Sequence, residues 1–296
     1  QRLRRTDQHL RFGVAGFGGT GRRLAALGMP MKHVIQFSGG AGSYAAARRV
    51  HERGEGELIL LCADPRSEHE DWRSFVDACH DSLPGSELVV LDQGFDLWDL
   101  ADQQKMIPNP RVDFCSRILK REPLRKWLEE HCDPEETVIH LGFDWTEEHR
   151  LNRARPHWEP WQIEAPMMWE PVMDKSDALA MISDAGIPMP SAYDTGMPHN
   201  NCLKYGCVKG GMAYWAKVLE VYPEAYARSE YREEAFRERS GKDVSILKDR
   251  KGGTTKPLPL RKFRIQIEVA SEQNPTLFDP SDWGDCSCMV PVASDD

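Results

Sequence analysis

The clearest structural signal in the chain is the stretch His33-Val34-Ile35-Gln36-Phe37-Ser38-Gly39-Gly40-Ala41-Gly42-Ser43. Its first five residues predict a short strand, and the alanine-rich residues 44–50 predict a helix that begins near Ser43. A strand, a glycine-rich turn and a helix can cradle phosphate, because glycine lets the backbone approach the anion and the helix N-terminus offers unpaired N–H groups. The alternative is a tight turn without a ligand. The two framing serines favour phosphate binding.

Further apolar segments predict a mostly parallel sheet. Residues 58–64, 88–91 and 137–142 read as strands, and near-continuous apolar strands are typical of sheets covered on both faces. Asp64 ends its strand, at the edge where such sheets bind ligands. Pro166 and Pro171 confine the apolar segment between them to a short or edge strand, and a helix over 174–186 follows. We therefore predict a doubly wound α/β fold with the phosphate loop after its first strand.

The composition is that of a globular chain. Of 296 residues, 40% are hydrophobic and 29% charged, and the net charge of −9 excludes an indiscriminate DNA-coating protein. No run of about 18 apolar residues and no secretory signal is present, so we expect a cytoplasmic protein without a membrane partner.

Three regions are predicted along the chain. Residues 1–30 hold six arginines and one aspartate, which favours a flexible basic leader, with Met29 or Met31 as an alternative start. Their G-x-G-x-x-G pattern at 16–21 lacks the preceding strand that a dinucleotide loop needs. Residues 31–190 form the nucleotide-binding domain. Residues 191–296 form a helical extension that carries a cysteine cluster.

Two internal motifs carry charged side chains. In Cys115-Ser116-Arg117-Ile118-Leu119-Lys120, the two basic residues would share one helix face, hold an anion and lower the pKa of the thiol. An amphipathic helix with a solvated basic side is the alternative. In the second motif, Gly142 ends a strand and Glu147 and Arg150 follow one helical turn apart.

The cysteines outside the expected core suggest a metal or redox site. Cys202 and Cys207 form a C-x4-C pair on a glycine-bearing turn, and two thiolates alone do not complete a zinc site or a four-iron cluster. We propose a ligand set of Cys115, Cys202, Cys207 and one of Cys286 and Cys288. Zinc, a redox dithiol and a purely structural role are the alternatives. Cys62, Cys79 and Cys132 are expected in the core.

These motifs, in this order over roughly residues 31–290, resemble the PP-loop ATP pyrophosphatase, or adenine nucleotide α-hydrolase-like, superfamily. Residues 38–43 resemble its S-G-G-x-[DG]-S loop, although many members carry Asp where Gly42 stands. Residues 115–123 resemble the C-[ST]-R-x-L-K…P motif of the phosphoadenosine phosphosulfate (PAPS) reductase-like family. Residues 141–150 resemble L-G-x-x-x-x-E-x-x-R, and residues 199–211 resemble the H-N-N-C-x4-C-V-K-x-G element of phage and bacterial members.

The resemblance implies an enzyme that binds ATP, or PAPS, with Mg²⁺. It places the adenine nucleotide on Ser38, Gly39, Gly40, Gly42, Ser43, Asp64, Gly142, Glu147 and Arg150, and the anionic group on Arg117 and Lys120 beside Cys115. The implied reaction is adenylation of a substrate followed by sulfur transfer, with a [4Fe–4S] cluster on the cysteines. The acceptor would be a small molecule or a nucleobase, the sulfur source a cysteine desulfurase or thiol donor, and the assembly a homodimer.

Two other functions remain open at this point. One is PAPS- or adenylylsulfate-reductase-type reduction, which consumes a thiol donor rather than ATP. The other is a nucleotide-binding subunit of a DNA-modification or defence complex, without turnover.

Overall fold

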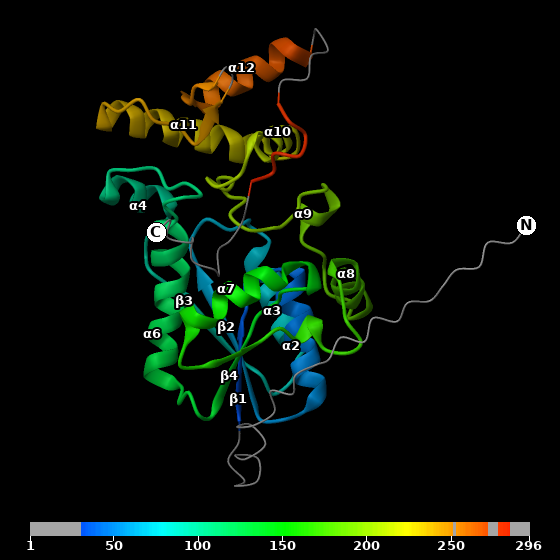
Figure 1. Ribbon diagram of the computed structural model, residues 1–296. Coiled ribbons are helices and arrows are strands. Elements are labelled where there is room, and N and C mark those ends of the chain that lie inside the picture. The colour runs from blue at the N-terminus through cyan, green and yellow to red at the C-terminus, as the bar shows by residue number, and fades with distance from the viewer. Residues whose placement is uncertain (1–30, 251–252, 272–277, 285–296) are drawn as a thin grey trace, which may run out of the picture.

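The computed structural model describes residues 31–250, 253–271 and 278–284, so the predicted leader, Cys286 and Cys288 lie outside the described residues. The described part centres on a five-stranded sheet whose strands are all parallel (Figure 1). The strand order β3-β2-β1-β4-β5 confirms the predicted fold class. The strands are β1 (Lys32–Gln36), β2 (Glu57–Asp64), β3 (Glu87–Asp92), β4 (Thr137–His140) and β5 (Gln162–Glu164), and a separate antiparallel pair comprises β6 (Leu247–Asp249) and β7 (Lys256–Leu258).

The strand order places the ligand crevice. From β1 the chain proceeds outward to β2 and β3 on one side, and then crosses over to β4 and β5 on the other. Ligands of open α/β sheets bind where this order reverses, outside the carboxyl ends of the strands. In this sheet the order reverses between β1 and β4, and the glycine-rich loop follows directly after β1.

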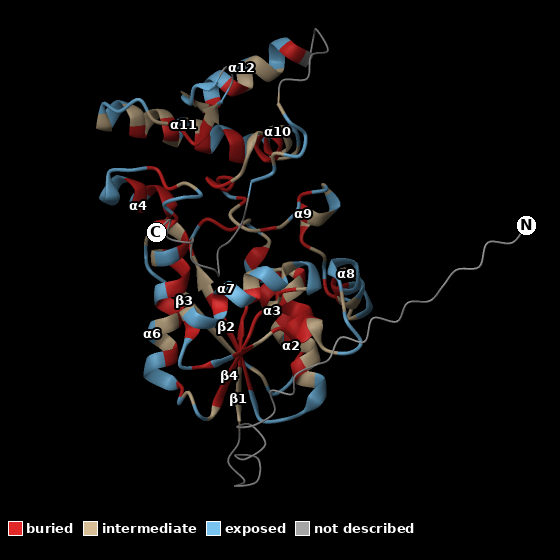
Figure 2. Ribbon diagram, viewed as in Figure 1, coloured by how far each residue is buried: buried red, intermediate tan, exposed pale blue. Residues whose placement is uncertain are grey.

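Helices cover both faces of the sheet (Figure 1). Ile35 and Leu60 pack with α2, α3 and α8 on one face, whereas Val34, Ile59 and Ile139 pack with α6 and α7 on the other. Figure 2 shows the resulting buried centre of the sheet. The helices on the sheet are α2 (Ala41–Arg53), α3 (Trp72–Asp81), α6 (Glu122–His131), α7 (Glu148–Trp158) and α8 (Lys175–Asp184), and the short connecting helices are α4 (Leu97–Gln104), α5 (Phe114–Ser116), η1 (Arg117–Arg121), η2 (Trp145–Glu147), η3 (Pro166–Met168) and α9 (Ser191–Asp194).

A helical layer lies beyond the carboxyl ends of the strands and consists of α10 (Met212–Val221), α11 (Pro223–Ser240) and α12 (Leu260–Ser271) (Figure 1). Its core contains Trp215 and Tyr226 and also takes in Trp98 from α4. The buried Glu233 carboxylate accepts hydrogen bonds from the backbone N–H groups of Ile246 and Leu260, at 2.7 and 2.6 Å, and burial raises its pKa to about 7. Within the described ranges, no helix is both long and apolar enough to cross a membrane.

The structure differs from the sequence prediction in two short segments. Residues 166–168 form the 3₁₀ helix η3 rather than part of a strand, and β5 ends before them at Glu164. Pro166 has no N–H for a ladder and starts this helix instead. Residues 117–121 form a π-helix, so Arg117 and Lys120 do not share a face: Arg117 is exposed, whereas Lys120 is buried.

A histidine pair, in which His140 is buried and His33 is half-buried, lies on the sheet face that α2 covers. His33 Nδ1 and His140 Nε2 are 3.0 Å apart, and the Glu164 carboxylate lies 3.9 Å from His140 Nδ1. Burial lowers the pKa of His140 well below its usual range, and His33 and Arg53 lower it further. Burial also lowers the pKa of His33 and raises the pKa of Glu164. The folded protein therefore holds this pair neutral.

We expect the pair to make the fold sensitive to acid. Since the folded-state pKa of His140 is depressed, the unfolded chain binds more protons below about pH 6.5, and stability is lost as pH falls through that range. The melting temperature should therefore drop between pH 7 and pH 5, and His140→Gln should reduce the drop. The exposed His149→Gln serves as the control and should follow the parent chain. If the melting temperature of His140→Gln falls with pH as steeply as that of the parent chain, the histidine pair is not the cause of the acid sensitivity.

Candidate functional site

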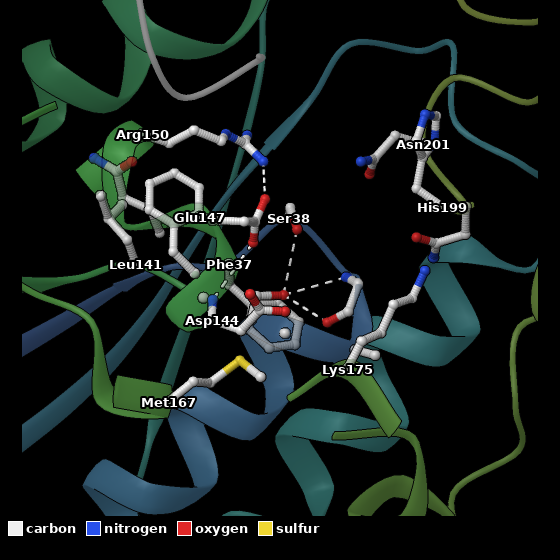
Figure 3. Close-up of a pocket in the computed structure, with 18 of the residues that line it drawn as sticks. Phe37, Ser38, Leu141, Asp144, Glu147, Arg150, Met167, Lys175, His199 and Asn201 are labelled. Atoms are coloured by element: carbon white, nitrogen blue, oxygen red, sulfur yellow. Dashed lines mark hydrogen bonds and ion pairs between the residues drawn. The ribbon is translucent and has the colours of Figure 1, made fainter. Parts of the chain in front are cut away.

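A cavity of about 440 Å³ opens above the carboxyl ends of the strands (Figure 3). Such a volume suits a nucleotide-sized ligand. Its walls include the glycine-rich loop, the segment after β4 and residues 198–201 from beyond the sheet, together with side chains from β1, β2, η1, α6, η3, α8 and α9. Of the residues proposed from the sequence for nucleotide binding, the cavity is lined by Ser38, Gly40, Gly42, Ser43, Gly142, Glu147 and Arg150.

The glycine-rich loop is held in one conformation by its own serines and by α3. Gly40 is the N-cap of α2, and the Ser43 hydroxyl accepts a hydrogen bond from Gly40 N at 3.2 Å and donates to Gly40 O at 2.8 Å. Trp72 Nε1 donates to Ser38 O at 3.0 Å. Gly39 has a φ of +72°, and a Cβ there would lie 2.3 Å from Trp72 Nε1. A glycine is therefore required at position 39 by both conformation and space.

A backbone-to-backbone contact joins this loop to the segment after β4. A Cβ on Gly42 would lie 2.5 Å from Gly142 O, and a Cβ on Gly142 would lie 2.4 Å from Gly42 C and 2.5 Å from Ser43 N. Neither position has space for a side chain. The contact requires glycine at both positions.

Replacing Gly142 by alanine is expected both to destabilise the protein and to displace the glycine-rich loop that Gly142 contacts. The added methyl group would meet immobile backbone atoms, and overpacking of this kind costs about 1–3 kcal/mol of unfolding free energy. Thermal or denaturant unfolding measures the loss. Gly40→Ala is the matched control, because a Cβ there meets its nearest neighbours at 3.4–3.6 Å. Equal stability of Gly142→Ala and the parent chain would refute the contact.

Side chains from residues 191–201 reach back onto the loop. Asn200 Nδ2 donates to Gly39 O at 2.6 Å, and Ala41 N donates to the Tyr193 hydroxyl at 3.1 Å. Burial raises the pKa of Tyr193, so the phenol stays neutral. Sequence reasoning assigned no role to either residue. Asn200 lay within the recognised H-N-N-C motif, which was the available signal, whereas nothing in the sequence pointed to Tyr193.

Three cationic side chains line the cavity. Arg150 pairs with Glu147 and lies over the Phe143 ring, 4.5 Å from its centroid. Lys175 comes from α8, and burial lowers its pKa. Lys120 Nζ donates to the Glu68 carboxylate at 2.8 Å in a buried ion pair. Arg150 and Lys120 are each paired with a carboxylate, and Asp144 also lines the cavity, so the feature of the wall that favours anions is the N-terminus of α2 at the loop.

Gly39, Asp64 and Arg117, which were predicted to bind the nucleotide or its anionic group, do not line this cavity. Arg117 is 52% exposed and pairs with Glu122, so it lines neither of the cavities described here. Asp64 accepts a hydrogen bond from Arg66 N at 2.7 Å and is absent from the cavity wall. The π-helical turn accounts for Arg117, because it directs Lys120 inward and Arg117 outward.

A second, much smaller cavity of about 20 Å³ brings together Cys115, Cys202 and Cys207. Lys120 and Lys209, both buried, also line it, and Lys209 Nζ donates to the Ser116 hydroxyl at 3.0 Å. Lys120 therefore belongs to both cavities. Cys62, Cys79 and Cys132 are buried elsewhere, as expected, and burial raises the pKa of each thiol.

The thiol cavity does not fit a four-iron cluster with the described residues alone. Its volume is about that of one water molecule. Across residues 31–250, 253–271 and 278–284, no three His, Cys, Asp or Glu side chains are arranged to hold a metal ion. The chain does return to this region at Gly284, which bridges to Gly210.

No protein-family model and no curated protein matches the chain. Among solved structures, it is similar to a PAPS reductase from Candida auris in a phosphate complex, with a TM-score of 0.40 and 14% identity over 59% of this chain and 82% of that one. It is also similar to an NMN synthetase from Francisella tularensis, with a TM-score of 0.35 and 11% identity over 88% and 93%. Similarities of this size do not indicate a function for this chain.

Proposed function

We propose that the protein is a PP-loop-type enzyme that binds an adenine nucleotide and adenylates a substrate for sulfur transfer. The observation that carries this proposal is Lys120, whose side chain lines both the nucleotide-sized cavity and the cavity of the three cysteines. Because Lys120 lines both cavities, a phosphate in the large cavity and a cysteine sulfur in the small one could act on the same substrate.

The loop supplies phosphate binding. The N-terminus of α2, framed by Ser38 and Ser43, would hold the phosphate chain, and Lys120 and Lys175 would neutralise charge that develops at the α-phosphate. Mg²⁺ binds mostly through one or two carboxylates together with substrate phosphates. Asp144 and Glu147 lie in the cavity wall and suit this role. Asp64, the residue proposed from the sequence, stands outside the wall.

In the proposed reaction, a substrate oxygen attacks the α-phosphate and pyrophosphate leaves. A sulfur nucleophile then displaces AMP from the activated carbon. The Cys115, Cys202 and Cys207 side chains line one small cavity together with those of Lys120 and Lys209, and the thiolate is the form of cysteine that reacts in sulfur chemistry. The acceptor is proposed to be a small molecule or a nucleobase, and the sulfur donor a desulfurase or another thiol.

The second candidate is sulfonucleotide reduction, and the same thiol cavity favours it. A thiolate of the trio would attack the sulfur of PAPS and displace adenosine 3′,5′-bisphosphate. A second thiol would then attack the cysteine sulfur and release sulfite, and the two thiols would be oxidised to a disulfide. ATP consumption with pyrophosphate release distinguishes transfer from reduction, which instead consumes PAPS and thiol. If the protein binds a nucleotide but turns over neither ATP nor PAPS, the result would favour a nucleotide-binding subunit of a larger complex.

A bulky substitution in the loop tests nucleotide binding. Gly40→Val would direct its two methyl groups towards Ser38 and the anion site, so ATP binding measured by calorimetry should be lost. The melting temperature should stay close to that of the parent chain, because an alanine Cβ fits at this position. Gly40→Ala is the control and should bind more tightly than Gly40→Val. Unchanged ATP affinity in Gly40→Val would remove the phosphate-loop assignment.

The cysteine proposal is tested by iron and acid-labile sulfide analysis after anaerobic purification. If a cluster forms with a fourth ligand from Cys286 or Cys288, Cys115→Ala, Cys202→Ala and Cys207→Ala should each lower both contents. Cys79→Ala and Cys132→Ala, at buried sites elsewhere, should leave them unchanged. Iron-free parent protein in which Cys202 is alkylated faster than Cys79 and Cys132 would exclude the cluster and favour thiol chemistry.

A further inference from the structure

The last residue of β1, Gln36, carries an amide without a partner. The side chain is 2% exposed, and neither Nε2 nor Oε1 has a hydrogen-bond partner within the described ranges. Within the described ranges, Gln36 is the one residue that has two buried side-chain atoms in this condition. Buried polar groups are nearly always paired in folded proteins. An amide that is left unpaired in this way points to a partner from outside the chain.

The surroundings of Gln36 offer it no partner from the protein. On the sheet its register neighbour in β2 is Leu61. Both residues line the large cavity, together with Ala63, Leu124 and Leu141. This wall is apolar and faces α6, whereas the phosphate loop begins only two residues further along the chain. The cavity therefore has an anion-binding end and an apolar end, and Gln36 lies at the apolar end.

We infer that the Gln36 amide reads the base of the bound nucleotide. It would accept a hydrogen bond from the 6-amino group of adenine and donate one to the adjacent ring nitrogen. A glutamine amide matches this edge of adenine in bidentate fashion. The apolar wall would cover the ring faces, while the phosphates lie on the α2 N-terminus. The inference rests on the proposed nucleotide binding and adds a residue that determines base specificity.

The test compares three probes. ATP carries the 6-amino group, purine riboside 5′-triphosphate lacks only that group, and tripolyphosphate lacks the whole nucleoside. The parent chain should prefer ATP to the purine analogue by about tenfold to 100-fold. In Gln36→Leu this preference should disappear, because the two changes remove the same interaction and are therefore not additive. Tripolyphosphate affinity should be the same in both proteins.

Two further measurements separate recognition from a structural role. Gln36→Leu should raise the melting temperature of the ligand-free protein, because leucine removes an unpaired amide from an apolar wall. Gln36→Glu should weaken ATP binding more than GTP binding, because a carboxylate only accepts hydrogen bonds and guanine offers donors at N1 and N2. Gln103→Leu, an exposed position on α4, is the control and should match the parent chain.

The outcomes distinguish the inference from the function on which it rests. Loss of stability in Gln36→Leu with an unchanged preference for ATP would show that a structural water satisfies the amide, and would overturn the inference alone. Failure of the parent chain to bind either tripolyphosphate or ATP would overturn the phosphate site, and the inference with it.

Discussion

The close approach of Gly42 to Gly142 is the constraint on which the site depends. It presses the first turn of α2 against the segment that follows β4, with no side chain between the two backbones. Because β1 and β4 are neighbours at the point where the strand order reverses, and because Gly42 and Gly142 both line the cavity, this contact forms part of the cavity wall. The glycine-rich loop, the Glu147–Arg150 pair and the apolar wall line the same cavity.

The C-terminal part of the chain completes the site rather than merely covering it. Asn200 holds the Gly39 carbonyl, and the backbone N–H of Cys202 donates to Glu68, which also binds Lys120. One buried carboxylate thus connects the cysteine-bearing turn to a cation of the nucleotide cavity. Removing one partner of such a buried pair leaves an uncompensated charge, so the two cavities are energetically linked.

The described histidines and cysteines lie in two different kinds of surroundings. The His33–His140 pair, Cys62 and Cys79 lie within the sheet layers, where burial keeps each of them neutral. The Cys115, Cys202 and Cys207 side chains instead line the second cavity together with those of Lys120 and Lys209. The two groups of cysteines therefore differ in whether basic side chains share their surroundings.

The sequence by itself determined the parallel sheet, the glycine-rich turn before α2 and the Asp174-capped helix α8, because apolar periodicity, glycine spacing and capping residues act locally along the chain. Only the tertiary structure decided which charged residues face the cavity. The π-helical turn sends Lys120 inward and Arg117 outward, and nothing in helical spacing predicts that turn. Tyr193 and Gln36 likewise acquire their positions from packing between segments far apart in sequence, and such contacts leave no periodic signal in the chain.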